Sequence, residues 1–532
     1  MFLAIFSYYP PVSFAARMLP RCVAADTVTN VTAQGGERAN EPKLFVSLQT
    51  FAKTMKAGKV LAFILGVFIL MGIGWVFWPA EGIVVFGYTL RFPSMQRKLA
   101  EAGEKKVDVD AVIDAVEESF EMQEDTLSYY RNYFRDNANR IYLPEDDYAY
   151  FDSVFFDFER GRRCGKVYRI AHYGDSQIEM DRLSAELREA LQERFGGEGT
   201  GMFPIRTNVP SASVVKSTVG KVVHYTMYGD SLTRRAPHNR YGVMAQLNQV
   251  YGSSIVHIRP TGSKTAFPRT RTFSRLSLLL GRNTDRFSAR VISDTLKFEP
   301  KVLAKDTLGA VLLTWDFPYP VEKASLYLSG NAEIYGAMTD GRGGVAVDNI
   351  PLRGCSGTIF TRIDENLMQR SFALDDTRLI ILQFGGNYMP AATSTKVIEG
   401  YQAKIANQIR YFRRVAPAAK ILFIGPSDMG KSVGGRIVTW PRLPEMVDSL
   451  KSTALSNGVA YWDLYRVMGG ENSMKDWVKH NPPYAGPDYI HFTQKGARIV
   501  GDALARSLLV YYDFYTLRKT LPGDSVEQFM KQ

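Results

Sequence analysis

Residues 166–191, KVYRIAHYGDSQIEMDRLSAELREAL, combine a strand pattern, a turn and a helix pattern in one short segment. Its first part, Lys166–His172, reads as a strand, and Gly174-Asp175 marks a turn soon after it. The apolar residues that follow recur at helical spacing: Met180, Leu183, Leu187, Ala190 and Leu191. Ser176 is therefore predicted to lie between a strand and a helix.

The same alternation returns in the last third of the chain. Short apolar runs predict strands at Arg378–Phe384, Lys420–Gly425 and Val459–Leu464. Helix faces are indicated by two sets of residues: Ile405, Ile409 and Phe412, and then Ala497, Val500, Leu504 and Leu508. Strands that alternate with helices predict an α/β fold with a mainly parallel sheet and helices on both faces. We expect residues 165–205 and 376–515 to build this domain.

Residues 206–375 follow a different pattern. Short strand-like runs such as Lys221–Met227, Ser254–Arg259 and Ala310–Trp315 are separated by turns rich in Gly and Asn, and few stretches have a helical period. We expect an inserted all-β domain here, a sandwich or jelly roll.

One segment near the N-terminus is long enough to cross a bilayer. Residues 59–78 read KVLAFILGVFILMGIGWVFW and carry no charge after Lys59. Lys53 and Lys56 also precede the apolar run, which favours a cytoplasmic N-terminus and places the rest of the chain outside the cytoplasm. We interpret this transmembrane helix as an uncleaved signal anchor. A cleaved signal peptide and a buried soluble helix are the alternatives.

The flanks of that segment differ from the remainder. Residues 1–54 show no sustained period, and we interpret them as a disordered tail or as the result of an over-extended translation start. Residues 97–145 are charged and helical in pattern, with an acidic stretch at Asp114–Asp125, and we expect a solvated helical stalk.

Composition excludes several classes of function. A chain of 532 residues is too long for one core, so two or more folded units are expected. The formal net charge of +11 is scattered along the chain, so no nucleic-acid partner is predicted. Cys22, Cys164 and Cys355 are too sparse for a disulfide framework or a zinc site. We expect free buried thiols, with a Cys164–Cys355 bridge as the alternative. No nucleotide or metal motif is present, so no cofactor and no metal are predicted.

Three short polar motifs lie beside the predicted strands or before the last helix. Ser176, in HYGDSQ, can be a nucleophile at the carboxyl edge of the sheet or can merely cap a helix. Asp488 and His491, in DYIH, can supply the orienting carboxylate and the base that a hydroxyl nucleophile needs, or can form a surface contact. Asn387, in FGGNYM, can donate its amide to an oxyanion or belong to a plain turn.

Taken together and in this order, the motifs resemble the SGNH/GDSL hydrolase superfamily, whose blocks are GDS, GxN and DxxH. The matching residues are Gly174-Asp175-Ser176, Gly385-Gly386-Asn387, and Asp488 with His491. Tyr388 departs from the pattern, because the family often has Asp there. The resemblance covers about residues 165–205 and 376–512. It implies a three-layer SGNH-type sandwich and a catalytic triad of Ser176, His491 and Asp488.

The resemblance also implies an oxyanion hole. Its donors would be the Ser176 N–H, the Asn387 amide and the backbone N–H of a glycine in a further block. The candidate block is DNIPLRGCSGT, residues 348–358. Gly354 is the first choice and Gly357 the alternative, and both are also compatible with ordinary turns.

A β-rich insertion after the GDS block resembles the arrangement in bacterial peptidoglycan and polysaccharide O-acetylesterases. It implies a serine esterase that removes acetyl groups from an envelope glycan, held in the bacterial inner membrane by one span with its catalytic domain in the periplasm. An O-acetyltransferase with the same triad, served by a membrane acetyl-transfer partner, and a non-catalytic glycan-binding protein are the alternatives. The aromatic residues that could stack on sugars or pack in the core are Tyr228, Trp315 and Tyr335.

Overall fold

The computed structural model describes residues 57–79, 82–85, 88–90, 95, 107–117, 126–229, 234–262, 266–305, 309–521, 526 and 530. The chain divides into two units, Met1–Trp78 with Phe92–Met95, and Pro79–Arg91 with Gln96–Gln532. In the first unit helix α2 spans Ala57–Phe77, and its stretch Gly58–Phe77 is apolar and long enough to cross a membrane. The expected extension over residues 1–54 lies outside the described residues.

A mixed six-stranded sheet organises the second unit. Its strands, in spatial order, are β15 (Gly344–Pro351), β4 (Val167–Gly174), β16 (Thr377–Gln383), β17 (Lys420–Ile424), β20 (Ala460–Trp462) and β3 (Ile141–Tyr142). The pairings from β15 to β20 are parallel, and β3 joins β20 in the antiparallel sense. The carboxyl ends of the five parallel strands therefore meet at one edge of the sheet, where α/β folds bind their ligands.

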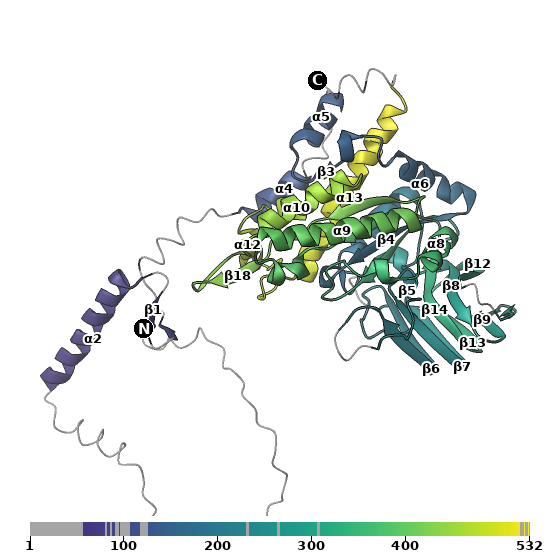
Figure 1. Ribbon diagram of the computed structural model, residues 1–532, viewed down its shortest axis with the longest axis horizontal. Coiled ribbons are helices and arrows are strands. Elements are labelled where there is room, and N and C mark those ends of the chain that lie inside the picture. The colour runs from purple at the N-terminus through teal and green to yellow at the C-terminus, as the bar shows by residue number, and fades with distance from the viewer. Residues whose placement is uncertain are drawn as a thin grey trace, which may run out of the picture. The chain divides into compact units, whose positions relative to one another are not determined.

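Helices cover both faces of this sheet. Helices α6 (Asp152–Cys164), α7 (Ser184–Phe195) and α13 (Gln494–Arg518) pack on one face, and helices α8 (Glu365–Leu374), α9 (Thr395–Val415) and α10 (Leu443–Ser456) pack on the other. Figure 1 shows α9 and α10 running side by side over the sheet. Successive strand residues alternate between the two cores, so Ile170 faces one and Ala171 the other. Burial on both faces explains why the strands read as nearly continuous apolar runs.

The chain between β4 and β15 is rich in antiparallel strands. Ten of them form one sheet: β5 (Gly201–Phe203), β6 (Val214–Thr226), β7 (Gln246–Pro260), β8 (Phe273–Asn283), β9 (Phe287–Ser293), β10 (Leu296–Lys297), β11 (Lys301–Leu303), β12 (Val311–Val321), β13 (Ala324–Ser329) and β14 (Ala332–Asp340). Met202, Met244 and Tyr335 share a core with Tyr173 of β4. Because this sheet packs into the same compact unit as the six-stranded sheet, a separate inserted domain stays a prediction.

Two expected boundaries need correction. Residues 344–351 belong to the six-stranded sheet as β15, although they were expected in the β-rich insertion over 206–375. Gly201–Phe203, in turn, pairs with β14 instead of belonging to the α/β part. The sequence pattern does not reveal these boundaries, because a short apolar run looks the same in either sheet.

The described part of residues 97–145 is not a solvated stalk. It contains α4 (Val109–Glu117), α5 (Thr126–Asp136) and the edge strand β3. Helix α5 buries Tyr130, Tyr133 and Phe134, and the ring of Phe134 stacks on Tyr511 of α13 with centroids 4.6 Å apart. The charged residues on the other face of the helix led to the prediction of a solvated helix, because sequence alone does not show which face is buried.

The remaining described elements are short. They are β1 (Ile83–Val85), β2 (Tyr88–Leu90), β18 (Gly430–Val433), β19 (Arg436–Thr439), α11 (Leu464–Val467) and α12 (Ser473–Lys479). Strands β18 and β19 form a hairpin, and the Gly430 N–H at its base donates to the Tyr489 carbonyl, 2.7 Å away. The hairpin is thereby joined to the loop that carries His491.

Candidate active site

The nucleophile candidate lies directly after the carboxyl end of β4. Ser176 opens a single turn of 3-10 helix, Ser176–Ile178, and its side chain is half-buried at the sheet edge. Asp175 caps this turn, since one of its carboxylate oxygens accepts the Gln177 N–H at 2.9 Å. The cap of the turn is therefore Asp175, and the Ser176 hydroxyl points to a different partner.

That partner is the imidazole of His491. Ser176 Oγ lies 2.7 Å from His491 Nε2, and His491 Nδ1 lies 2.7 Å from Asp488 Oδ2. Because a carboxylate can only accept, Nδ1 carries the proton in the neutral ring and Nε2 is left to accept the serine proton. The three side chains thus form a continuous hydrogen-bonded chain that can activate a hydroxyl.

Asp488 is held in its ionised form. Its second oxygen accepts the backbone N–H groups of Ile490 and His491, both at 3.0 Å. Burial alone would raise the pKa of Asp488, but the hydrogen bonds from the His491 side chain and from these two N–H groups outweigh it and lower the pKa. An ionised carboxylate at this position stabilises the imidazolium that forms when His491 takes a proton.

Two side chains of the nucleophile turn hold the loop that carries His491. Gln177 Nε2 donates to the Ile490 carbonyl at 2.6 Å. Arg182 donates to the Phe492 carbonyl at 2.9 Å and to the Ser176 carbonyl at 2.6 Å. The residues on either side of His491 are therefore hydrogen-bonded to the segment that carries Ser176. These bonds fix the position of the base relative to the nucleophile.

Asn387 reaches the same place from β16. It lies in a short 3-10 helix, Gly386–Ala391, just past the strand, and its Nδ2 donates to Asp175 Oδ2 at 2.8 Å. The other contact of this amide, to the Cys355 carbonyl, is long at 3.4 Å. The N–H that faces the Cys355 carbonyl is therefore only weakly bonded. It can donate instead to a stronger acceptor, such as an oxyanion.

Gly354 and Gly357, the two candidate oxyanion donors, have different surroundings. Gly354 follows β15 by three residues and lines the same cleft as Ser176 and Asn387. Among the described residues, none accepts a hydrogen bond from its N–H. Gly357 instead packs under Phe384, where an added Cβ would lie 2.6 Å from the ring, and its N–H points to Cys355 Sγ at 3.3 Å. The geometry therefore favours Gly354 as the donor.

These groups line a cleft of about 550 Å³. Its polar lining includes Ser176, His491 and Asn387, and its apolar lining includes Pro390, Met429 and Trp440. Arg353 and Glu179 form a bidentate ion pair at the cleft, with N–O distances of 2.7 and 2.6 Å. The cleft is open on one side to solvent, so it can admit part of a larger molecule.

Asp175 is an acid with a strongly perturbed pKa at this edge. Burial raises its pKa to about 6, although the Gln177 N–H, the Asn387 amide and the nearby His491 all oppose that effect. The sequence motif contained this residue, but we expected it only to mark the turn. Gln177 and Arg182 were also missed, and no local sequence signal identifies them, because their partners lie more than 300 residues away.

The other candidate residues are easily placed. Trp315 and Tyr335 are 2% and 1% exposed, so they are core residues and not sugar platforms, whereas Tyr228 is half-buried and donates to the Gly354 carbonyl at 2.7 Å. Cys164 and Cys355 are free; Cys355 is buried as expected, whereas Cys164 is exposed, and Cys22 lies outside the described residues. In the described part of the chain, no group of three or more His, Cys, Asp or Glu side chains could hold a metal ion.

Comparison with known proteins agrees with this architecture. Residues 325–499 match the GDSL-like lipase/acylhydrolase family, a range that includes Gly354, Asn387, Asp488 and His491 and begins after Ser176. A search of curated proteins gives no match.

One solved structure shares the fold, and others are similar over parts of the chain. A peptidoglycan O-acetylesterase is 21% identical with a TM-score of 0.53, over 68% of this chain and 95% of that one. A family two carbohydrate esterase from Cellvibrio japonicus is 10% identical with a TM-score of 0.24, over 57% and 99% of the two chains. An acetyl xylan esterase is 15% identical with a TM-score of 0.24, over 30% and 79%. Residues 325–499 therefore resemble the GDSL-like lipase/acylhydrolase family, and the chain shares its fold with a solved peptidoglycan O-acetylesterase.

Proposed function

We propose that this protein is a serine O-acetylesterase that removes acetyl groups from a carbohydrate of the bacterial cell envelope. The observation that carries the proposal is the pair of 2.7 Å contacts that links Ser176, His491 and Asp488 in an open cleft. The peptidoglycan O-acetylesterase that shares the fold supports an acetylated glycan as the substrate.

Acylation begins at Ser176. His491 Nε2 takes the hydroxyl proton while Ser176 Oγ attacks the acetyl carbonyl carbon, and Asp488 stabilises the imidazolium. The carbonyl oxygen becomes an oxyanion that accepts the N–H groups of Ser176 and Gly354 and the free N–H of Asn387. The tetrahedral intermediate then collapses, the bond from carbon to the sugar oxygen breaks, and His491 gives its proton to that oxygen.

Deacylation repeats these steps with water. Water enters the open side of the cleft, and neutral His491 removes its proton as it attacks the acetyl-Ser176 ester. The second tetrahedral intermediate uses the same three donors, and it collapses as His491 gives the proton to Ser176 Oγ. The bond from carbon to Oγ breaks, and acetic acid leaves and ionises to acetate. The enzyme therefore returns to its starting protonation state after each turnover.

Location follows from helix α2. We propose that Gly58–Phe77 anchors the chain in the inner membrane and that the unit with Ser176 lies in the periplasm, where an envelope glycan is present. The length and apolar composition of the helix support this arrangement, together with Lys53, Lys56 and Lys59 before it.

Acetate release tests the proposal. The full chain in detergent is given p-nitrophenyl acetate and O-acetylated peptidoglycan, each with and without an added acceptor sugar. Ser176→Ala is expected to lower acetate release on the order of 10³-fold or more, because the nucleophile is lost while the fold is kept. Ser356→Ala is the matched control, since this half-buried serine does not line the cleft.

The outcomes separate the alternatives. Ser176→Ala activity above about a tenth of wild type would contradict the nucleophile assignment. Acetyl transfer to the acceptor in preference to water would identify an O-acetyltransferase with the same triad. Labelling of wild type but not of Ser176→Ala by a fluorophosphonate is expected, and an unreactive wild type would favour a glycan-binding protein without catalysis.

A further inference from the structure

A second cavity, of about 940 Å³, opens beside the catalytic cleft. Strand β6 and the segment 200–211 form most of its wall, and Arg353 and Gly354 line both this cavity and the cleft of Ser176. The Ala212 N–H donates to the Met180 carbonyl at 3.1 Å, which fixes this wall to the loop after the nucleophile turn. A substrate that occupies the cleft can therefore extend into the cavity.

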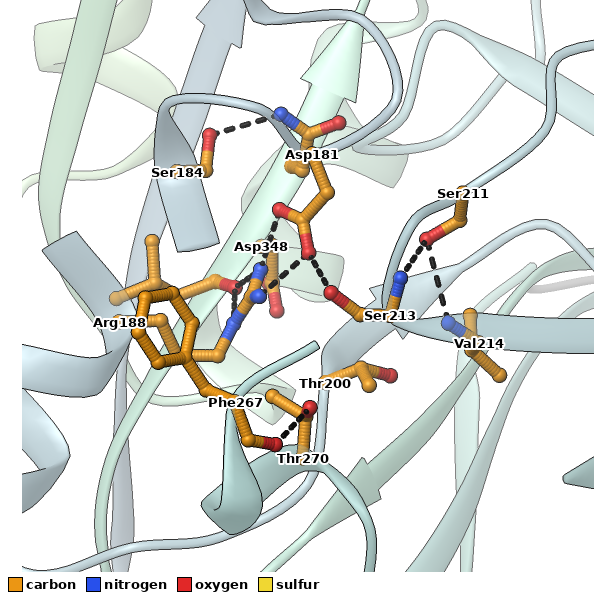
Figure 2. Close-up of polar contacts among 12 residues, drawn as sticks. Asp181, Ser184, Arg188, Thr200, Ser211, Ser213, Val214, Phe267, Thr270 and Asp348 are labelled. Carbon is orange, nitrogen blue, oxygen red and sulfur yellow. Dashed lines mark hydrogen bonds and ion pairs between the residues drawn. The ribbon is translucent and has the colours of Figure 1, made fainter. Parts of the chain in front are cut away.

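The acid in this cavity is already neutralised. Asp181 is the one carboxylate among the described residues that line it, and Arg188 donates to both of its oxygens at 2.6 and 3.0 Å. Ser213 donates a further short hydrogen bond to the same carboxylate. Figure 2 shows Asp181 enclosed between Arg188 and Ser213. Because Arg188 and Ser213 hold this carboxylate, it compensates little of the positive charge of the cavity's other basic side chains.

Those other groups are basic. The Lys216 ammonium forms no ion pair with a described residue and lies 5.4 Å from the ring centroid of Phe203. Arg206 is exposed at the wall, and its one side-chain hydrogen bond goes to the Val222 carbonyl at 2.9 Å. His224 lies on the same strand as Lys216 and contacts Gln246 at 2.8 Å. The cavity therefore holds Lys216 and Arg206, two cationic side chains for which no described residue supplies a carboxylate partner.

Lys216 is half-buried in the wall of the cavity. Burial lowers its pKa to about 8, and the charge of Asp181 only partly opposes this. A half-buried ammonium is stabilised when an anion binds beside it, because the attraction is screened less than in bulk water. An anionic group is consequently the ligand chemistry that this cavity fits best.

We propose that this cavity binds a carboxylate of the glycan substrate through Lys216 and Arg206, so that the enzyme prefers acetylated glycans that bear carboxylates to neutral ones. The inference rests on the proposed esterase function and adds the class of substrate. The carboxylate can belong to a peptide attached to the glycan or to a uronic acid ring, and both present the same two-oxygen acceptor to an ammonium and a guanidinium.

The test compares charge variants on charged and neutral esters. Wild type, Lys216→Met, Arg206→Gln and Lys221→Met are assayed for acetate release from O-acetylated peptidoglycan, O-acetylated alginate, acetylated xylan and p-nitrophenyl acetate. Lys221→Met is the matched control, because Lys221 lies on the same strand but is exposed and contacts Tyr251 instead of the cavity. The two acidic polymers distinguish a peptide carboxylate from a ring carboxylate.

We expect Lys216→Met to lower kcat/KM on at least one acidic polymer by about 10- to 100-fold, mainly through KM. Arg206→Gln should also lower kcat/KM on that same polymer. The activity of both variants on acetylated xylan and on p-nitrophenyl acetate should stay within about twofold of wild type. The activity of Lys221→Met should stay within about twofold of wild type on every substrate.

Equal losses on charged and neutral substrates, or no loss on either acidic polymer, would overturn the carboxylate site. A wild-type enzyme that prefers acetylated xylan to both acidic polymers would also overturn the carboxylate site. It would leave the esterase proposal intact. Absence of turnover on all four esters by wild type would instead contradict the esterase proposal itself.

Discussion

Asp175→Asn is a substitution whose effects on activity and on stability should go in opposite directions. In the wild-type protein one carboxylate oxygen accepts the Gln177 N–H and the other accepts Asn387 Nδ2. An asparagine at position 175 keeps one acceptor oxygen and replaces the other with an NH2 group. If the remaining oxygen stays with Gln177, two amide nitrogens face each other at the position of the present 2.8 Å contact, and both are donors.

Asn387 should relieve that conflict by rotating its amide. Its oxygen would then replace the nitrogen that is oriented for the oxyanion, so one donor is lost. Removal of one oxyanion donor costs about 10²- to 10³-fold in kcat in other hydrolases, and we expect kcat on p-nitrophenyl acetate to fall by that factor. In an Asn387→Ala background the same substitution should cost less than about threefold, because the donor is already absent.

Stability should respond in the other direction. A pKa raised from 3.8 to about 6 corresponds to roughly 3 kcal/mol by which the folded protein disfavours the charged form. The proton on Asp175 therefore stabilises the fold fully below pH 3.8, and this contribution is lost as the pH rises through about 6. A neutral asparagine should make the protein more stable than wild type by about 1–3 kcal/mol at pH 8, and by much less at pH 4.

The assays are kcat on p-nitrophenyl acetate and thermal unfolding midpoints at pH 4 and pH 8. Asp428→Asn is the matched control, because burial also raises the pKa of Asp428 to about 6, while its partners are Thr439, Ser473 and the Met474 N–H instead of Asn387. The control should keep kcat within about threefold of wild type, as expected for a group away from the oxyanion. If Asp175→Asn retained more than about half of the wild-type kcat, the role of Asp175 in orienting Asn387 would be refuted. A stability difference that is the same at both pH values would refute the account of its pKa.

Three further predictions concern single features. Gly357→Ala should lower the free energy of unfolding by about 2 kcal/mol or more, since the new methyl group would lie 2.6 Å from Phe384 at a φ of +76°. Gly354→Ala, with a similar φ of +74° but its nearest neighbour at 3.8 Å, should cost only about 1 kcal/mol, and equal shifts in thermal midpoint would contradict this reasoning. Tyr228→Phe should lower kcat about fivefold with an unchanged thermal midpoint, because it removes one hydrogen bond to the Gly354 carbonyl, and an unchanged kcat would argue against a role in placing that glycine. Alkaline phosphatase fused after the last residue should be active and a fluorescent protein that matures only in the cytoplasm should be dark, whereas the opposite pattern would reverse the proposed orientation.

Local patterns in the sequence were sufficient for several features. The strand, turn and helix around Ser176 could be predicted because side-chain alternation, a Gly-Asp turn and helical spacing are properties of neighbouring residues. The same holds for α2, whose length and composition decide whether it can cross a bilayer. Asn387 and His491 could be named because each motif follows a buried strand or precedes a helix, and these positions gather at one edge of an α/β sheet.

Contacts between distant segments decided the rest. The Asp175–Asn387 hydrogen bond joins residues 212 positions apart, and Gln177 reaches a carbonyl 313 positions away, so no window of sequence contains both partners. The side chains of α5 are aromatic on one face, but only packing against α13 shows that this face is buried. Strand β15 and the basic cavity at Lys216 depend in the same way on which segments the fold places side by side. Local sequence therefore specifies the chemical groups and the elements that carry them. Their partners are set by the fold, because burial and hydrogen bonding depend on residues that are remote along the chain.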